Sequence, residues 1–419
     1  MSSRPAPATE PLTVVGIGVD GWDGLSPAGR AALAAADVVL GSARQLELLP
    51  DDVTALHVPW PTPLVPALAG LLTEYADRRC AVLASGDPTM YGIAPTIRRV
   101  LPDATLVVLP HPSSLSLACA RLGWSQADVE VLSLVGRPIQ TLHPLIQPGR
   151  RLLVLAQDAD SPAQVAAVLR ERGFGPSRLI ALSRLGGEDE QQVRSSAAAW
   201  PTSGWPEGTA GDPLTVLAVE AVAGPDADRL STVPGLPDTA YENDGQLTKR
   251  HVRAITLSSL APAPGQLLWD VGGGAGSIGI EWMRHHRSCR AISVERDPDR
   301  VARIRRNADA LGVPGLDVVT GSAPAVLSEL PTPDAVFVGG GAGNPGMLAA
   351  CWQALPPGGR LVVNVTTLES EQAVYAAQAE HGGELTRIEI IRAAPIGRFT
   401  GWRPAMPVTQ WVIQKGPGE

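Results

Sequence analysis

Short apolar runs bounded by glycine or proline alternate with alanine-rich segments of helical spacing along nearly the whole chain. In the first half, buried strands are predicted at Leu12–Ile17, Cys80–Ala84, Thr105–Leu109, Arg151–Leu155, Leu179–Leu182 and Leu214–Glu220. Helices are predicted between them at Pro27–Ala36 and Ala163–Arg172. Alternation of this kind is typical of α/β layers built around a largely parallel sheet. The chain is therefore expected to have an α/β fold.

One segment, residues 224–246, interrupts this alternation. It is rich in proline, glycine, aspartate and threonine and has no sustained periodicity, which predicts an interdomain linker. The length of 419 residues agrees with more than one domain, since a domain has roughly 100–200 residues. We therefore expect a disordered tail at 1–10, a first domain at 11–223 and a second domain at 247–419.

A second α/β series follows the predicted linker. Its strands are predicted at Gln266–Val271, Ala291–Glu295, Leu316–Thr320, Ala335–Val338 and Arg360–Val365. Its helices are predicted at Thr248–Leu260, Ser277–His285, Pro298–Leu311, Pro324–Leu330, Pro345–Leu355 and Glu369–His381. The closing runs Leu385–Arg392 and Val408–Ile413 are expected to pair antiparallel. Five βα units finished by an antiparallel strand favour a class I methyltransferase sheet, because a dinucleotide-binding sheet would more often continue its parallel winding.

Composition argues against several classes of protein. A formal net charge of −8 without a basic tract argues against a nucleic-acid binder. No stretch is apolar for long enough to span a membrane, and the first residues lack the apolar core of a signal peptide. The cysteines are far apart in the sequence, which argues against a cysteine-based metal centre and indicates a reducing compartment. These are Cys80, Cys119, Cys289 and Cys351. We expect a cytoplasmic protein without a bound metal.

The strongest local signal is a glycine-rich turn between a predicted strand and a predicted helix, Leu268-Trp269-Asp270-Val271-Gly272-Gly273-Gly274-Ala275-Gly276-Ser277-Ile278-Gly279. Glycines let a ligand approach the backbone, and the helix amino terminus favours a carboxylate or phosphate. Glu295 ends the next strand, where it can accept hydrogen bonds from both ribose hydroxyls of a nucleoside. Gly274-x-Gly276-x-x-Gly279 matches the dinucleotide fingerprint, so NAD stays open. Asp270 favours S-adenosylmethionine, because a carboxylate suits an aminoacyl ammonium better than a pyrophosphate.

Two further loops are predicted at the carboxyl edge of the second sheet, where open α/β sheets bind ligands. Ser322 and Ala323 follow the third strand and offer small side chains beside an adenine. The run from Gly339 to Asn344 follows the fourth strand and is expected to face the reacting group. The predicted cofactor contacts are thus Asp270, Gly272, Gly273, Gly274, Ala275, Gly276, Glu295, Ser322 and Ala323. The predicted catalytic residues are Gly339, Gly340, Gly341 and Asn344.

The second half, from about Pro237 to Gly416, resembles the decarboxylating methyltransferase module of the cobalamin (corrin) pathway. The resemblance is carried by Leu247-Thr248-Lys249-Arg250-His251-Val252-Arg253-Ala254, Leu268–Trp282, Phe337-Val338-Gly339-Gly340-Gly341 and Val362-Val363-Asn364. It implies a Rossmann-like class I S-adenosylmethionine methyltransferase fold, and it adds Thr248 to the cofactor contacts.

The first half resembles the tetrapyrrole (class III) methyltransferases. The resemblance is carried by Val15-Gly16-Ile17-Gly18, Ala84-Ser85-Gly86-Asp87-Pro88 and Pro112-Ser113-Ser114-Leu115-Ser116-Leu117-Ala118-Cys119-Ala120. It implies two α/β subdomains with the cofactor in the cleft between them. The implied cofactor contacts are Gly86, Asp87, Met90, Ser113, Ser114 and Leu115.

One chain with both modules in this order resembles the fused, decarboxylating methyltransferases that act on precorrin-6Y. The resemblance implies methylation at C5 by the first domain, and methylation at C15 with loss of the C12 acetate carboxylate by the second. It further implies precorrin-8X as the product, one S-adenosylmethionine site per domain, and self-association as a homo-oligomer. Two alternatives stay open: a sirohaem-type fusion of a methyltransferase with an NAD-dependent dehydrogenase, and a corrin- or cofactor-binding protein without turnover.

Nearly all the basic residues are arginines: of 34, only Lys249 and Lys415 are lysines. Genomic composition bias can produce such a ratio without any functional cause. Guanidinium groups would nevertheless suit a polycarboxylate substrate, because one guanidinium can donate two hydrogen bonds to one carboxylate. Four arginines flank the motifs or the closing loop of the second domain and are expected to contact substrate. They are Arg250, Arg253, Arg398 and Arg403.

Overall fold

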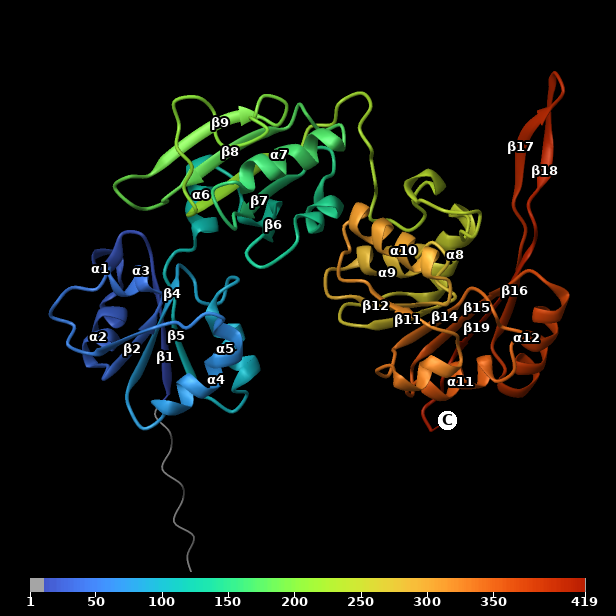
Figure 1. Cartoon of the computed structure of the whole chain (residues 1–419), viewed down its shortest axis with the longest axis horizontal. Helices are drawn as coiled ribbons and strands as arrows, with labels where there is room; N and C mark the ends of the chain where they lie inside the picture. The colour runs from blue at the N-terminus through green and yellow to red at the C-terminus, as the bar shows by residue number, and fades with distance from the viewer. Residues whose placement is uncertain (1–10, 419) are drawn as a thin grey trace, which may run out of the picture. The chain divides into compact units, whose positions relative to one another are not determined.

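The computed structural model describes residues 11–418, so the tail expected at 1–10 lies outside the described residues. The chain forms two compact units, each with its own sheets and core (Figure 1). The amino-terminal unit comprises the chain up to Arg137 together with Pro148–Ala227. The carboxyl-terminal unit comprises Pro138–Gln147 and the chain from Asp228 onwards. Within 11–418, no helix has the length and apolar character that a membrane crossing requires.

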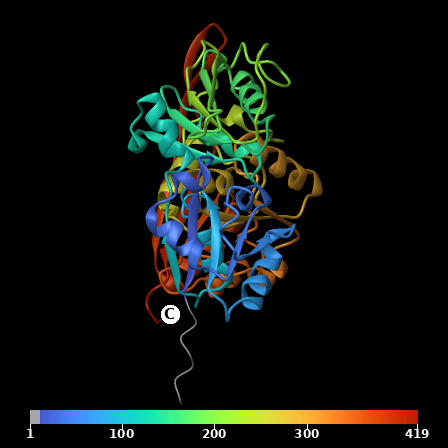
Figure 2. The same ribbon diagram turned by 90° about the vertical axis from the view of Figure 1, so that its left-hand side faces the viewer.

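The first sheet of the amino-terminal unit is parallel, in the order β3-β2-β4-β1-β5. Its elements are β1 (Leu12–Ile17), α1 (Gly21–Gly24), α2 (Pro27–Ala35), β2 (Val38–Gly41), α3 (Ala43–Leu46), β3 (Leu56–Pro59), α4 (Leu64–Glu74), β4 (Cys80–Ser85), α5 (Ile93–Val100) and β5 (Leu106–Leu109). Alternate strand residues face opposite cores: Val15 packs with residues of α2 and α3, and Val14 packs with residues of α4 and α5. Helices therefore cover both faces of the strands drawn in blue in Figure 2.

The second sheet of this unit is mainly antiparallel, in the order β6-β7-β10-β8-β9. Its elements are α6 (Ser114–Leu122), η1 (Gln126–Asp128), β6 (Val129–Ser133), β7 (Arg151–Leu155), α7 (Ser161–Glu171), β8 (Arg178–Ser183), β9 (Gln191–Ser196) and β10 (Thr215–Glu220). Within this sheet, as far as the structure describes it, β6 and β7 form the one parallel pair. The expectation of a largely parallel sheet is wrong for this part of the chain. The connection between β8 and β9 is too short for the crossover that a parallel pair needs.

The carboxyl-terminal unit has a seven-stranded sheet in the order β13-β12-β11-β14-β15-β19-β16. Its strands are β11 (Leu267–Val271), β12 (Arg290–Glu295), β13 (Asp317–Thr320), β14 (Ala335–Val338), β15 (Arg360–Val365), β16 (Glu384–Ile388) and β19 (Val408–Gln414). Its helices are η2 (Ile139–Leu145), η3 (Asp238–Ala240), α8 (Arg250–Leu260), α9 (Ser277–His285), α10 (Pro298–Ala310), η4 (Ala325–Glu329), α11 (Met347–Ala354) and α12 (Leu368–His381). Strands β11 to β15 are parallel and β19 is antiparallel, which is the expected class I methyltransferase arrangement.

Alternation along β11 assigns the helices to the two faces of this sheet. Leu268 belongs to a core that includes residues of α8, α9 and α10, whereas Trp269 belongs to a core with residues of α11 and α12. The sheet is therefore buried on both sides, as its near-continuous apolar strands predict. At the position of the predicted helix Pro324–Leu330, the structure has the short 3₁₀ helix η4 instead.

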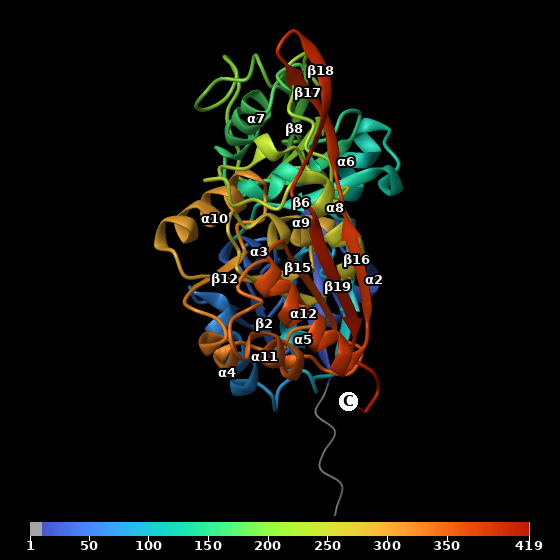
Figure 3. The same cartoon turned by 90° about the vertical axis from the view of Figure 1, so that its right-hand side faces the viewer.

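The end of the chain differs from the sequence-based expectation. Strand β16 pairs antiparallel with β19, as expected for the two closing runs, but it ends at Ile388. The following residues form a separate hairpin of β17 (Ile391–Ile396) and β18 (Phe399–Pro404). Figures 1 and 3 show this hairpin extending beyond the sheet. Most of its residues are exposed, so no buried apolar run marks it in the sequence.

Most of the segment 224–246, which was predicted as an interdomain linker, is part of the carboxyl-terminal unit in the structure. From Asp228 onwards it belongs to the carboxyl-terminal unit, and Leu236 and Tyr241 are buried in the core of that unit. The side chain of Glu281 accepts hydrogen bonds from the backbone N–H groups of Gly235 (2.6 Å) and Leu236 (3.0 Å). Its proline and glycine content indicated a lack of regular secondary structure but not its burial.

Candidate functional site

A cavity of about 660 Å³ opens at the carboxyl ends of β11 and β14, where the strand order of the sheet reverses. Ligands of open α/β sheets bind at such a switch point, outside the carboxyl ends of the strands. The loops after β11 and β14 meet here. A Cβ added at Gly272 (φ +79°) would lie 3.1 Å from the backbone nitrogen of Gly340. Glycine at 272 thus allows the two loops to line one cavity.

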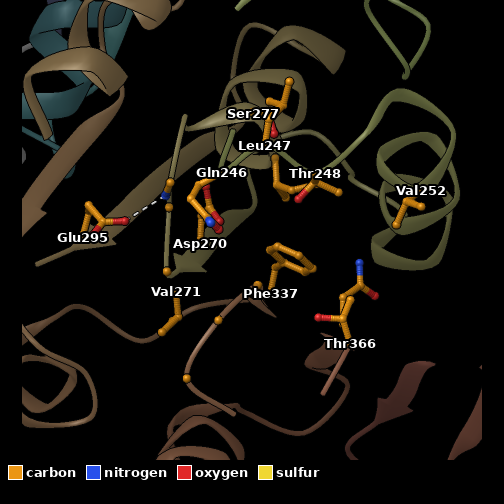
Figure 4. A pocket seen from close by; sticks show the side chains of 18 of the residues that line it. Gln246, Leu247, Thr248, Val252, Asp270, Val271, Ser277, Glu295, Phe337 and Thr366 are labelled. Atoms are coloured by element: carbon orange, nitrogen blue, oxygen red, sulfur yellow. Dashed lines mark hydrogen bonds between the residues drawn. The ribbon is translucent and has the colours of Figure 1, made fainter. Parts of the chain in front are cut away.

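The carboxylate of Glu295 is fixed at the end of β12 by backbone groups. Its Oε2 accepts a hydrogen bond from the N–H of Gly274 at 2.9 Å, drawn as a dashed line in Figure 4. Its Oε1 accepts hydrogen bonds from the N–H groups of Arg296 (2.9 Å) and Asp297 (3.1 Å). Gly274 has φ +58°, a conformation that favours glycine. Glu295 is therefore a preorganised acceptor, as a nucleoside ribose requires.

Asp270 lies in the wall of the same cavity, close to the end of β11. Its Oδ2 accepts hydrogen bonds from the Ser293 hydroxyl (3.0 Å) and from the N–H of Gly279 (3.2 Å). Burial raises the pKa of Asp270 to about 7, against the lowering effect of these two hydrogen bonds and with a small further increase from Glu295. A ligand cation beside this carboxyl would favour its ionised form.

Two further parts of the cavity wall come from the loop after β13 and from strands β14 and β15. Ser322 and Ala323 follow β13, and Phe337 ends in the cavity between Thr248 and Thr366 (Figure 4). Asn364, on β15, also lines the cavity. Its Nδ2 donates to the Thr256 hydroxyl (2.8 Å) and its Oδ1 accepts from the Gln410 side chain (3.0 Å), so its amide is held in one orientation.

The remaining wall is formed by the start of α8 and the base of the β17–β18 hairpin. Val252 packs against Ile388, Ile390 and Val408 in a small apolar cluster. The polar lining residues on this side are Lys249, His251 and Arg392. Nη2 of Arg392 lies 3.1 Å from Nδ1 of His251. The cavity therefore combines an acceptor at its nucleoside end with an apolar and basic wall at another end.

The motif loops of the amino-terminal unit also meet at the carboxyl ends of parallel strands. Gly86 follows β4 with φ +59°, and a Cβ added there would lie 3.1 Å from Cα of Ser113. A Cβ added at Gly16, on β1, would lie 2.1 Å from the carbonyl oxygen of Gly86 and 2.6 Å from the nitrogen of His111. Three sequence blocks that are far apart in the chain thus form one tightly packed corner.

Other residues expected in this first site lie around the same corner. The hydroxyl of Ser113 caps α6 by accepting from the N–H of Ser116 (3.1 Å). Oδ1 of Asp87 accepts from the N–H (2.8 Å) and hydroxyl (2.7 Å) of Thr89, which fixes the turn after Gly86. Met90 is exposed, whereas Leu115 is buried in the core beside α6.

Comparison with known proteins assigns each half of the chain to a family. Residues 11–200 match the tetrapyrrole (corrin/porphyrin) methylases, and residues 239–415 match the precorrin methyltransferase domain. A precorrin-6Y C(5,15)-methyltransferase [decarboxylating] of Sinorhizobium is 45% identical over 99% of this chain and 99% of its own. The chain belongs to the decarboxylating precorrin-6Y C(5,15)-methyltransferase family. Members of this family are S-adenosylmethionine-dependent methyltransferases, so neither the dehydrogenase nor the carrier alternative is supported.

Two shorter relatives match parts of the chain. A cobalt-precorrin-6B C(15)-methyltransferase (decarboxylating) of Salmonella typhimurium is 30% identical over 40% of this chain and 89% of its own. The crystal structure of the C-terminal domain of a precorrin-6Y C5,15-methyltransferase from Rhodobacter capsulatus is 47% identical in sequence. It covers 44% of this chain and 100% of that chain, with a TM-score of 0.42.

The cavity brings together most of the residues that were predicted for the precorrin methyltransferase half. The lining residues from that prediction are Thr248, Asp270, Gly272, Gly273, Gly274, Glu295, Ser322, Ala323, Gly339, Gly340, Gly341 and Asn344. Ala275 and Gly276 are part of the same loop but do not line the cavity. These groups fit S-adenosylmethionine. The fixed carboxylate of Glu295 can accept from the ribose, the buried acid Asp270 can lie beside an ammonium, and the glycines leave space that a Cβ would occupy.

None of the four arginines predicted to contact substrate lines the cavity. Arg253 is a correction: its side chain is fully buried and its guanidinium donates to Glu281, so it has a structural role. Arg398 lies in the turn of the hairpin over the Phe399 ring (5.1 Å) and is not among the residues that line the cavity. Arg250 is exposed on α8, and Arg403 lies opposite Arg392 in the hairpin.

Sequence reasoning missed several lining residues, above all Arg392, His251 and Asn364. Two of them stand inside blocks that carried the family resemblance, so a signal for them existed. Arg392 had none, because its place in the cavity wall depends on the hairpin, which the sequence did not predict.

Proposed function

We propose that this chain transfers two methyl groups from S-adenosylmethionine to precorrin-6Y, at C5 and C15. It also removes the carboxylate of the C12 acetate, giving precorrin-8X in cobalamin biosynthesis. The observation that carries this proposal is the similarity over 99% of the chain to the Sinorhizobium enzyme, whose name contains both positions and the decarboxylation. The cavity supports it, because a fixed nucleoside acceptor lies beside a glycine-lined space in the precorrin methyltransferase domain.

The two activities are divided between the units in this proposal. The amino-terminal unit methylates C5, and the carboxyl-terminal unit methylates C15 and removes carbon dioxide. The Salmonella relative supports the division, since it spans only 40% of this chain and its name combines C15 with decarboxylation but omits C5. The two separate family matches, to 11–200 and 239–415, agree with two independent methyltransferase modules.

Each unit binds one S-adenosylmethionine, which supplies an electrophilic methyl group. In the carboxyl-terminal unit, Glu295 would accept from the ribose and Asp270 would lie near the aminoacyl ammonium, with Ser322 and Ala323 beside the adenine. In the amino-terminal unit, the binding residues are those of the corner described above. They are Gly86, Asp87, Met90, Ser113, Ser114 and Leu115.

The chain's own residues contribute alignment and exclusion of water. Methyl transfer to carbon is an in-line displacement, so catalysis depends on holding the nucleophilic carbon in line with the methyl group. A Cβ added at Gly340 would have no other atom within 4 Å, which leaves an open space where a substrate edge would fit. When the acetate loses carbon dioxide, the conjugated macrocycle accepts the electron pair, and the methylene carbon then takes up a proton. The loop from Gly339 to Asn344 shapes this pocket.

Mass spectrometry of the full chain tests the proposal. Precorrin-6Y is incubated with the protein and S-adenosylmethionine carrying a deuterated methyl group, and released carbon dioxide is measured in parallel. The product should gain two labelled methyl groups and lose one carbon dioxide, and neither change should occur without S-adenosylmethionine. A product that gains one methyl group and loses two hydrogens in the presence of NAD would instead support the dehydrogenase alternative.

The proposal also covers partners and location. We place the protein in the cytoplasm as a homo-oligomer that does not bind nucleic acid. The described cysteines are all free, which suits a reducing compartment, and the net charge of −8 opposes nucleic-acid binding. Phe399 and Trp402 of the hairpin are 67% and 74% exposed, and a second copy of the chain would cover such apolar side chains. Sedimentation of the full chain measures the oligomeric state.

A further inference from the structure

Two basic side chains that line the cavity are not among the residues assigned to the nucleoside. His251 comes from the first turn of α8 and Arg392 from β17, and both line the cavity. The cavity wall also contains apolar side chains, among them Phe337, Val252 and Met406. Figure 4 shows Glu295 and Val252 on opposite sides of the cavity. A flat ligand that reaches the methyl donor at one end would therefore meet these basic groups at the other.

The contact between Arg392 and His251 fixes the hydrogen positions of the histidine. A guanidinium has only donors, so Nδ1 of His251 must accept the 3.1 Å hydrogen bond from Arg392. The neutral ring then carries its hydrogen on Nε2. The pair thus offers the Nε2–H of His251 and the other N–H groups of Arg392 as donors. No protein acceptor for these groups occurs among residues 11–418.

Arg403 adds a second positive charge beside Arg392. The two residues are direct partners in the antiparallel hairpin, so their side chains lie on the same face. Like charges in this position destabilise a hairpin unless something neutralises them. In the described chain, neither arginine has a carboxylate within ion-pair distance. By contrast, Arg300 and Arg306 on α10 are paired with Asp244 and Glu242 at 2.9 Å and 2.6 Å.

We propose that Arg392, supported by His251 and Arg403, binds a side-chain carboxylate of the tetrapyrrole in the carboxyl-terminal site. This inference rests on the proposed function, since it names the group that holds that substrate. A bound carboxylate accepts from the N–H groups of Arg392 that do not contact His251, and it neutralises the repulsion between Arg392 and Arg403. His251 supports this contact by accepting from Arg392 and so holding the guanidinium in place. The macrocycle lies between this anchor and the methyl donor, so Arg392 is a positioning residue that sets which edge of the ring faces Gly340.

A carboxylate can also come from the methionine part of S-adenosylmethionine, and binding experiments distinguish the two sources. The full chain is saturated with S-adenosylhomocysteine, which cannot transfer a methyl group, and precorrin-6Y is titrated by absorbance. We expect two substrate-binding phases in the wild type. In Arg392→Ala one of them should weaken roughly 10- to 100-fold, which is typical for loss of hydrogen bonds to a charged group. The affinity for S-adenosylhomocysteine should not change, and Arg392→Lys should recover part of the loss.

Steady-state measurements complete the test. In Arg392→Ala the KM for carbon dioxide release should rise by a similar factor, with a smaller change in kcat, and C5 methylation should be unchanged. Arg398→Ala is the matched control, because Arg398 belongs to the same hairpin but lies at its turn. Unchanged substrate affinity in Arg392→Ala, equal losses in Arg398→Ala, or weakened S-adenosylhomocysteine binding would each overturn the inference. The proposed function itself fails only if the wild type gains no second methyl group or releases no carbon dioxide.

Discussion

Nε of Arg253 donates a 2.6 Å hydrogen bond to Oε1 of Glu281, and both side chains are buried. Glu281 also accepts hydrogen bonds from the N–H of Gly235 and from the hydroxyl of Tyr241 (2.9 Å). Burial, and then the Glu281 carboxylate, raise the pKa of Tyr241 well above its usual value, so this hydroxyl remains a donor. The pair therefore fastens the segment before α8 to α9, and the end of that segment, Gly245–Thr248, lines the cavity.

Removal of one partner of this buried pair should destabilise the carboxyl-terminal unit strongly. In Arg253→Met the Glu281 carboxylate stays buried without its cation, which typically costs about 3–5 kcal/mol of the free energy of unfolding. Urea unfolding measures the loss, and hydrogen exchange should place it in 228–418. Arg287→Met, at an exposed arginine after α9, should change stability by about 0.5 kcal/mol or less. A loss in Arg253→Met as small as in this control would contradict the structural role.

The elements that the sequence predicted best are those whose signals are local. Helix α9 has the predicted bounds, Ser277–His285, because a glycine turn begins it and its apolar residues recur at helical spacing. Strand β15 has the predicted bounds for a similar reason: its run Arg360–Val365 is almost continuously buried. Strands β3 and β9 were missed, since Leu56–Pro59 and Gln191–Ser196 are short and largely exposed, with no alternation to distinguish them from loops.

The same distinction between local and non-local signals applies to the residues of the candidate site. Asp270 and the glycines after it could be predicted, because strand, turn and helix follow one another directly and parallel strands place their loops at one edge. Arg392 could not, since it meets His251 across 141 residues and only through the hairpin. Arg253 was misassigned for a related reason: its partner Glu281 lies on another helix, and sequence spacing does not reveal a buried ion pair.

The buried carboxyl of Asp270 should make stability depend on pH. Its pKa of about 7 in the folded chain lies above the ordinary value of 3.8, so the folded state binds more protons between these pH values. The contribution of this group to stability is fully present below about pH 4 and is lost as pH rises through about 7, a change of the order of 4 kcal/mol. Asp270→Asn stays neutral and can still accept from Ser293, so it should lack this loss.

Urea unfolding of both proteins at about pH 5 and about pH 8 measures the effect. Asp270→Asn should gain stability relative to the wild type at the higher pH, and parallel curves would contradict the raised pKa. Calorimetric titration with S-adenosylmethionine provides a second measurement. The ammonium of this ligand favours an ionised neighbour. The affinity of the carboxyl-terminal site for S-adenosylmethionine should therefore increase with pH through about 7 in the wild type and not in Asp270→Asn.

Gly16→Ala should disable the amino-terminal site selectively. The new Cβ would lie 2.1 Å from the Gly86 carbonyl oxygen, a backbone atom, so the corner must shift at a cost of about 1–3 kcal/mol. Calorimetry with S-adenosylhomocysteine should show binding at one site per chain instead of two, and C5 methylation should be lost. Gly70→Ala is the matched control, since Gly70 lies in α4 with no other atom within 4 Å of its added Cβ. Two intact sites in Gly16→Ala would contradict the proposed location.

Gly340→Trp should disable the site in the carboxyl-terminal unit while the fold stays intact. Its added Cβ meets no atom within 4 Å and its φ is not positive, so an indole would project into the cavity instead of straining the loop. C15 methylation and carbon dioxide release should fall at least about 100-fold, because a blocked pocket cannot align the substrate, whereas C5 methylation should persist. Gly315→Trp, at an equally open position outside the cavity, should remain active.

Mixing Gly340→Trp with Gly16→Ala should restore the doubly methylated product, whichever carbon is methylated first. Loss of both methylations in Gly340→Trp, with no restoration in the mixture, would show that the two reactions do not belong to separate units.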